Sequence, residues 1–198
     1  MKIYDISQKV FGCEVYPGDP APKRETIASI SGGDLYNLTS FSMCAHNGTH
    51  VDAPSHFIND GATVSDIDLS QTVGYAFVAD FSGEMSGNDA REILSKAIAL
   101  SPEAAKRILI RGEATVTEEA ATVFADSGIL LLGVESQSVG AIDKPMPVHL
   151  TLLSRGVVLL EGVRLSNVTE GKYFLSAAPI LLNGCEGSPC RAVLIDAD

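Results

Sequence analysis

Residues 46–57 of the chain read His46-Asn47-Gly48-Thr49-His50-Val51-Asp52-Ala53-Pro54-Ser55-His56-Phe57. This stretch holds three of the four histidines in the protein, with an aspartate between two of them. Imidazole nitrogens and carboxylate oxygens are the usual ligands of a catalytic divalent metal ion. A single histidine here would be read as a surface residue on a polar loop. Three together in an acidic chain indicate metal binding, proton transfer, or both.

The spacing of this stretch predicts a bent segment around a short extended centre. Side chains at even positions share one face of an extended chain. From the first to the last histidine, however, an extended chain would span roughly 33 Å, at about 3.3 Å per residue, which is too wide for one metal site. Gly48 and Pro54 lie where bends are needed, and the β-branched residues argue against a helix. We expect His50 and Asp52 to form the central pair.

Two residues about a hundred positions later are candidates to complete the site, namely His149 and Glu161. Glu161 follows the aliphatic run 157–160, and a carboxylate at the end of a buried strand needs a partner. A metal ion is one such partner. A salt bridge to Arg155 or Arg164 is the other, and the sequence leaves both open.

The composition restricts the partners and the compartment. A formal net charge of -11 repels nucleic acid and anionic membrane surfaces, so we expect neither as a partner and favour a neutral, zwitterionic or small substrate. No apolar signal region follows Met1, and the longest apolar runs, such as 129–132, are too short to cross a bilayer. The four cysteines are irregularly spaced, which favours free thiols in a cytoplasmic protein.

Hydrophobic periodicity and turn signals predict one α/β domain over residues 1–198 with a mixed sheet. Two strands, 24–31 and 36–44, form a hairpin that leads into the histidine segment. The other expected strands cover residues 2–7, 72–81, 107–111, 129–134, 157–160, 173–182 and 191–196. The expected helices run from a cap at Asn88 or Asp89 through Ile98, from Ser101, over 117–125, and over 150–154.

The pattern HxGTHxDxPxH, here His46 to His56, resembles the signature of the cyclase family of metal-dependent hydrolases, which includes bacterial kynurenine formamidases and isatin hydrolases. The resemblance extends over nearly the whole chain. Its other parts are the turn Val15-Tyr16-Pro17-Gly18-Asp19, the element Gly133-Val134-Glu135 with Ser138, the pair His149 and Glu161 twelve residues apart, and the closing segment 187–193.

The resemblance implies a ligand set, a fold and an assembly. His46, His50 and Asp52 would bind one metal ion. Asp52 and Glu161 would bridge toward a second ion, which His149 also holds. The family fold is a swivelling β/β/α domain with a mixed, barrel-like sheet, and its members are usually dimeric. The metal would be zinc or manganese, with one or two ions per chain, because nitrogen and oxygen ligands suit several divalent metals.

The same resemblance implies hydrolysis of a small amide by metal-activated water. His56 would stay off the metal as general acid/base, a role that its ordinary pKa of about 6.5 suits. Phe57 and Tyr16 would supply flat apolar walls for an aromatic substrate. The substrate expected first is an aryl formamide such as N-formylkynurenine. A structural metal site is disfavoured, because such sites are rich in cysteine.

Departures from the family pattern concern the pocket rather than the ligands. Tyr16 stands where kynurenine formamidases carry tryptophan, and Glu135 stands where aspartate is common. Gly140 and Leu150 replace a frequent aspartate and a frequent second histidine. Two alternatives therefore stay open: a cyclic amide or lactone hydrolase using the same site, and a metal-binding or small-molecule-binding protein without catalysis. The second would have no need of an unliganded His56.

Overall fold

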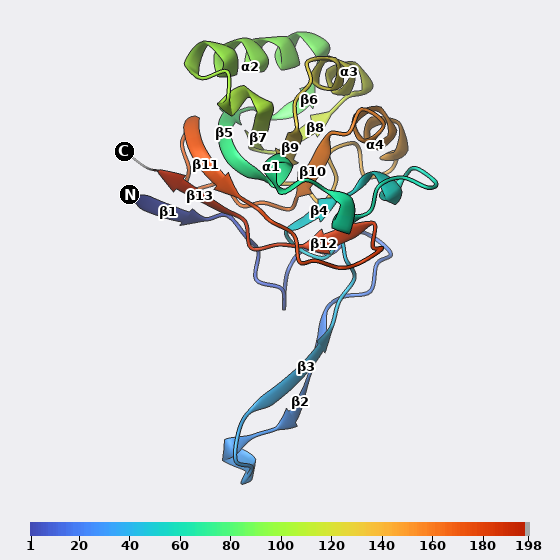
Figure 1. Cartoon of the computed structure of the whole chain (residues 1–198), viewed down its shortest axis with the longest axis vertical. Coiled ribbons are helices and arrows are strands. Elements are labelled where there is room, and N and C mark those ends of the chain that lie inside the picture. Colours follow the sequence, from blue (N-terminus) through green and yellow to red (C-terminus); the bar gives the residue numbers. More distant parts are fainter. Residues whose placement is uncertain (197–198) are drawn as a thin grey trace.

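A nine-stranded sheet forms the centre of the computed structural model, which describes residues 1–196 (Figure 1). Its strands lie in the order β1-β13-β11-β5-β7-β9-β10-β4-β12. Their bounds are β1 (Lys2–Asp5), β4 (His50–Asp52), β5 (Val73–Asp80), β7 (Arg107–Arg111), β9 (Leu131–Val134), β10 (Val158–Glu161), β11 (Gly171–Ser176), β12 (Gly187–Pro189) and β13 (Val193–Asp196).

The pairing of these strands is mixed, as the sequence predicted. The four central strands β5, β7, β9 and β10 are parallel to their neighbours within that group. The flanking strands β1, β13, β11, β4 and β12 pair antiparallel. Central parallel strands are covered on both faces, which explains continuous aliphatic runs such as 157–160. The sheet curls toward a barrel, so the predicted α/β fold with a mixed barrel-like sheet is confirmed.

Three helices gather along one face of the sheet: α2 (Gly87–Leu100), α3 (Glu118–Asp126) and α4 (Met146–Leu153) (Figure 1). Side chains along strand β5 point alternately to the two faces of the sheet, and each face has its own hydrophobic core. Phe77 and Ala79 pack in the core with the helices, whereas Ala76 and Val78 pack in the core on the other face. Each large aliphatic side chain fully buried in this way stabilises the fold by about 1.5–3 kcal/mol.

Three helix predictions differ from the structure. The helix expected from Ser101 is only the 3₁₀ turn Ala104–Lys106. Helix α2 begins after Ser86, whose side chain and backbone form a reciprocal capping box with Asp89, so neither Asn88 nor Asp89 is the cap. Helix α4 begins at Met146 rather than at residue 150, because a proline near the first turn favours a helix start. His149 therefore projects from a helix and not from a loop.

The predicted hairpin is confirmed and projects far from the rest of the molecule (Figure 1). It consists of β2 (Lys23–Ala28) and β3 (Leu38–Ser42), and we call residues 23–42 the arm. The arm exposes a set of large apolar side chains: Ile27, Ile30, Leu35, Tyr36, Leu38 and Phe41. A two-stranded hairpin has little stability of its own in water, so this exposure requires an explanation.

The remaining elements are short. They are the parallel pair β6 (Gly83–Met85) and β8 (Ala114–Val116), helix α1 (Leu69–Thr72), and 3₁₀ turns at Ile30–Gly32, Pro54–His56, Val64–Asp66 and Ala104–Lys106. All four cysteines are free thiols, as expected. Within residues 1–196, none of the helices has the length and apolar character needed to cross a membrane.

Candidate metal centre

The short strand β4 carries the centre of the histidine segment. Its two end residues, His50 and Asp52, point to one face of the sheet, while Val51 is fully buried in the core on the other face. β4 lies between β10 and β12, and its register places Glu161 directly opposite His50. Residues paired in this way have side chains within contact distance. The extended stretch expected around His50 and Asp52 is thus present, and the sheet brings Glu161 to it.

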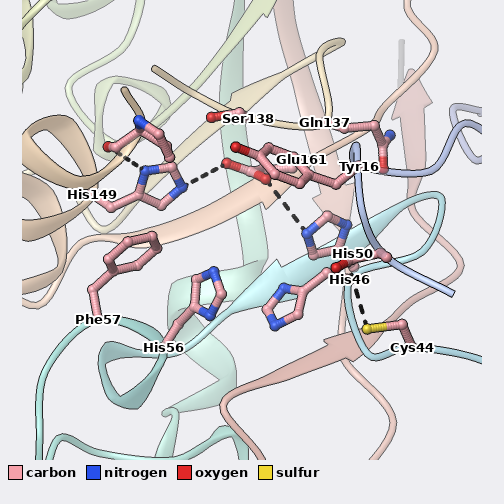
Figure 2. A pocket seen from close by; sticks show the side chains of 12 residues that line it. Tyr16, Cys44, His46, His50, His56, Phe57, Gln137, Ser138, His149 and Glu161 are labelled. Carbon is pink, nitrogen blue, oxygen red and sulfur yellow. Dashed lines mark hydrogen bonds and ion pairs between the residues drawn. The ribbon is translucent and has the colours of Figure 1, made fainter. Parts of the chain in front are cut away.

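Four side chains converge around Asp52. Its Oδ1 lies 2.9 Å from His46 Nδ1 and 3.3 Å from His50 Nε2. Its Oδ2 lies 3.8 Å from His149 Nε2. Glu161 completes the group, with Oε1 3.2 Å from His149 Nε2 and Oε2 3.5 Å from His50 Nε2 (Figure 2). Two triads that share Asp52 each have their ligand atoms within 4.8 Å of one another: His46 with His50, and His149 with Glu161.

Backbone carbonyls orient two of the imidazole rings. Nδ1 of His50 donates to the carbonyl of Gly48 at 3.0 Å, and Nδ1 of His149 donates to the carbonyl of Pro145 at 2.8 Å. Each ring therefore turns its Nε2 toward the carboxylates. A hydrogen bond from the outer ring nitrogen is how proteins usually orient a histidine that binds metal.

The ring of His46 is held from a different direction. Its Nδ1 faces Asp52, and its Nε2 lies 3.3 Å from Oε1 of the half-exposed Glu186. Gly187 in β12 makes room for this ring, because a Cβ there would lie only 2.4 Å from His46 Cε1. The sequence reasoning did not identify Glu186 and noted Gly187 only as part of the resemblance, since neither carries a signal for this role before β12 is placed beside β4.

The salt bridges considered for Glu161 do not form. Arg155 pairs with Asp126 at 3.0 Å, and Arg164 pairs with Glu14 at 3.0 Å. Glu161 instead accepts a hydrogen bond from the backbone N–H of Val139 at 2.8 Å and faces the histidines. The sequence left a salt bridge and a metal ion open as partners of Glu161, and these contacts favour the metal ion.

The electrostatics of the cluster also fit a cation. Burial disfavours the charged form of His50, but hydrogen bonds to Asp52 and Glu161 outweigh it and raise the pKa of this histidine to about 10. Burial raises the pKa of Asp52, yet hydrogen bonds from His46 and His50 bring it well below its ordinary value. Asp52 Oδ2 is buried without a hydrogen-bond partner within residues 1–196. A field that holds protons on buried imidazoles also favours a divalent cation, which displaces those protons on binding.

His56 is the exception among the histidines. It ends the 3₁₀ turn Pro54–His56, and its ring stacks on His46 with a centroid distance of 4.1 Å. Its ring nitrogens make no hydrogen bond or ion pair with the described residues, and it belongs to neither triad. Burial lowers the pKa of His56, and the neighbouring rings of His46 and His149 add to this effect. At neutral pH the ring is therefore uncharged and able to accept a proton.

A cavity of about 220 Å³ opens over the cluster. Tyr16 and Phe57 both line it (Figure 2). The Tyr16 hydroxyl donates to the carbonyl of Ile142 at 2.6 Å, and the Phe57 ring lies 4.5 Å from the His149 ring, measured between centroids. A cavity of about 150 Å³ is enough for benzene, so one small aromatic molecule fits. Every site residue expected from the sequence lines the cavity except Asp52, which is fully buried beneath it.

Two polar residues that the sequence reasoning did not select also line the cavity, namely Cys44 and Gln137, and so does Asp19, which was noted only as part of the resemblance. Ser138, noted only as part of the resemblance, lines it as well. No signal in a single sequence distinguishes such residues from the many other polar residues in loops. Glu135 lies elsewhere and has a structural role, accepting hydrogen bonds from the N–H groups of Gly112 and Leu165.

Comparison with known proteins supports the geometry. The family model described as Cyclase, "Putative cyclase", matches residues 4–141. A kynurenine formamidase of Bacillus mycoides (strain KBAB4) is 34% identical over 205 residues, which is 96% of this chain and 95% of that protein. A kynurenine formamidase of Salinibacter ruber (strain DSM 13855 / M31) is 34% identical over 220 residues, covering 100% of this chain and 99% of its own length.

Solved structures agree with the fold. One described as a potential metal-dependent hydrolase with cyclase activity superposes with a TM-score of 0.83 and 30% identity, covering 100% of this chain and 98% of that one. Isatin hydrolase A from Labrenzia aggregata, bound to benzyl benzoate, gives a TM-score of 0.81 at 22% identity, with 100% and 94% covered. The second similarity supports the fold alone.

Proposed function

The chain belongs to the cyclase family of metal-dependent hydrolases, and from this premise we propose that it cleaves a small aryl formamide, with N-formylkynurenine the first substrate to test. The curated relatives that match over nearly the full length are kynurenine formamidases, which supports this substrate class. One observation carries the proposal: two triads share the buried Asp52, and His56 stacks beside them without a hydrogen-bond or ion-pair partner for its ring nitrogens among the described residues.

For the metal we propose the ligands that the resemblance implied. His46, His50 and Asp52 would hold one ion, and Asp52, His149 and Glu161 a second. We propose zinc or manganese, because the donor set combines imidazole with carboxylate and contains no thiolate. When bound, a divalent cation lowers the pKa of water toward about 7 and polarises the carbonyl of the amide.

His56 would move the proton during the reaction. Its ring is neutral at pH 7, so it can take a proton from the attacking water and deliver it to the leaving nitrogen. The adjacent rings of His46 and Phe57 restrict its position, with centroid distances of 4.1 Å and 4.5 Å. Holding the group in place is as important as its pKa for such a transfer.

Tyr16 and Phe57 would orient the substrate ring. Tyr16 is fixed by its hydrogen bond to Ile142, and Phe57 packs against His149. Flat walls in these positions would also keep bulk water from the reacting bond. A tyrosine in place of the formamidase tryptophan keeps an aromatic wall, so we expect it to alter the fit of the ring and not the reaction type.

A panel of amides tests this function. We expect the metal-restored protein to hydrolyse N-formylkynurenine and simple aryl formamides to formate and the free amine, and to open isatin at least ten-fold less efficiently in kcat/KM. The rates follow from absorbance changes of the products. Preferential opening of isatin would overturn the substrate assignment, and the absence of hydrolysis with zinc, manganese or both would overturn the function.

We also propose a homodimer in the cytoplasm. The arm projects from the rest of the molecule and exposes apolar side chains such as Leu35 and Phe41, which a second copy would cover. Residues 23–42 carry two basic and two acidic side chains, whereas the chain as a whole has a net charge of -11. Because the arm is electrically neutral, contact between two copies through it adds little charge repulsion. Free cysteines suit a reducing compartment.

A further inference from the structure

Among residues 1–196, Asp19 is the carboxylate that lines the cavity without belonging to either triad. Its Oδ2 lies 3.8 Å from Sγ of Cys44, the contact drawn as a dashed line in Figure 2, and a thiol is only a weak donor. Its Oδ1 has no hydrogen-bond or ion-pair partner within the described residues, and protein atoms do not enclose it. The half-buried carboxylate therefore has free acceptor capacity at the wall of the cavity.

A tight turn places Asp19 on this wall together with Tyr16. The N–H of Asp19 donates to the carbonyl of Tyr16 at 3.0 Å, with Pro17 and Gly18 between them. Gly18 has a φ of 100°, and proline followed by glycine at positive φ is the pattern of a type II turn. The hydrogen bond of this turn uses only the backbone of Asp19. Local structure thus explains the proline and the glycine but not the carboxylate.

The other polar groups of the wall are less suited to bind a cation. The side-chain polar atoms of Gln137 and Ser138 are enclosed by protein, so a ligand cannot reach them. The Tyr16 hydroxyl donates to the carbonyl of Ile142, and its neutral oxygen is a weaker acceptor than a carboxylate. The remaining carboxylate of the wall is Glu161, which faces the histidines of the proposed metal centre.

The charges on the wall favour a positive group over a negative one. No lysine or arginine is among the described residues that line the cavity. Outside the metal centre, a substrate carboxylate therefore finds no cationic side chain, whereas an ammonium group finds Asp19. The field of this carboxylate also reaches the aromatic wall. Burial raises the pKa of Tyr16, and the negative charges of Glu161 and Asp19 add to that effect.

We propose that Asp19 is a specificity-determining residue whose carboxylate accepts a hydrogen bond from an ammonium group of the substrate. Among aryl formamides, the site then selects those that carry a positively charged amine, as N-formylkynurenine does. This inference rests on the proposed function, because it concerns the part of the aryl formamide that is not cleaved. A hydrogen bond between two charged groups is about twice as strong as one between neutral groups, so its loss is measurable.

Binding of two matched amines tests the proposal without turnover. 3-Amino-1-(2-aminophenyl)propan-1-one carries an ammonium group at neutral pH, and 1-(2-aminophenyl)butan-1-one has a methyl group in its place. Both are titrated into metal-loaded wild type and Asp19→Asn, with ligand-observed NMR as the readout. We expect Asp19→Asn to weaken binding of the cationic amine roughly three- to ten-fold relative to the neutral amine. This range lies between an exposed ion pair and a buried charged hydrogen bond.

Glu84→Gln is the matched control, because Glu84 is exposed and does not line the cavity. It removes one negative charge from the chain, as Asp19→Asn does, and we expect it to keep the preference for the cationic amine. In the wild type this preference should fall as salt is added, and in Asp19→Asn it should depend much less on salt. Equal weakening of both amines by Asp19→Asn, equal effects of the two variants, or no binding of either amine to the wild type would overturn the role of Asp19.

Hydrolysis separates this role from the proposed function. The substrates are the two formamides formed on the ring nitrogen of these amines. We expect Asp19→Asn to raise KM for the cationic formamide relative to the neutral one. If both formamides are cleaved and the variant does not change the ratio of their KM values, the role of Asp19 fails and the function stands. If the amines bind with the expected difference but the wild type cleaves neither formamide, the function fails and the role of Asp19 stands.

Discussion

The four histidines of the cluster differ in what their ring nitrogens contact, and His56 is the exception. His46, His50 and His149 each face a carboxylate, whereas the ring nitrogens of His56 make no hydrogen bond or ion pair within residues 1–196 and its ring stacks on His46. We predict that His56→Ala lowers kcat by 100-fold or more, the usual contribution of a general acid/base, and leaves metal content unchanged. Elemental analysis and turnover of the same preparation check both parts. Loss of metal in His56→Ala would show that the division of roles is wrong, and His50→Ala is the variant expected to lose metal.

Gly187 offers a residue-scale test that leaves every proposed ligand in place. An added methyl group would press on His46 Cε1, and the backbone at this position has no positive φ to prevent the substitution. We predict that Gly187→Ala weakens metal binding roughly 10- to 100-fold, as loss of a residue that orients a ligand does. Competition with a chelator measures it. Gly32→Ala in the arm is the control, and equal metal affinity in both variants would contradict the role of Gly187.

The sequence was most informative at this scale. Clustering of histidines pointed to the site, and the two-residue period placed His50 and Asp52 on one face, as the structure has them. Glu186 and Gln137 were missed for a physical reason. Their place at the site arises from β12 lying beside β4 and from burial of the loop after β9, which are long-range contacts that local patterns do not encode.

At the scale of elements, an ion pair between two strands gives a prediction about how the stability of the fold depends on pH. Asp80 in β5 lies opposite Arg111 in β7, and the two side chains form a bidentate pair. The hydrogen bond from Arg111 lowers the pKa of Asp80. The pair therefore stabilises the fold above the unfolded pKa of about 3.9, and this contribution is lost as the pH falls through the lower folded pKa.

We predict that Asp80→Asn reduces the free energy of unfolding by less than about 1 kcal/mol at neutral pH, because the pair is partly exposed to solvent. The difference from wild type should shrink as the pH falls through the acid range. Thermal unfolding at several pH values measures it, with Arg111→Gln and the double variant closing the cycle. A difference that grows toward acid pH would have the wrong sign.

Element boundaries show where local signals fail. The strands at 107–111 and 157–160 were found because buried parallel strands read as aliphatic runs. The sequence pattern predicts the start of α4 at residue 150, four residues too late, and so puts His149 in a loop. Two prolines flank the first helical residue there, and the sequence reasoning treated that region as polar loop. In the structure α4 begins before His149 and packs on the sheet beside β10.

At the scale of the whole molecule, a single isolated chain does not explain why the arm exposes so many apolar side chains. We predict that the wild type sediments as a dimer and that Leu35→Asp/Tyr36→Asp at the tip of the arm shifts it to monomer. Leu35 is 95% exposed, so the change costs little in the isolated chain. Leu69→Asp, on an exposed part of the body, is the control that should remain dimeric. A monomeric wild type would contradict the role of the arm.

The dependence of hydrolysis on bound metal tests the central claim most directly. The protein is stripped with a chelator and restored stepwise with zinc or manganese, and bound metal and N-formylkynurenine hydrolysis are measured on the same samples. We predict that activity is lost on stripping and returns in proportion to the metal bound. Full activity in metal-free protein, or saturated metal sites without hydrolysis of any formamide, would contradict a metal-dependent amide hydrolase.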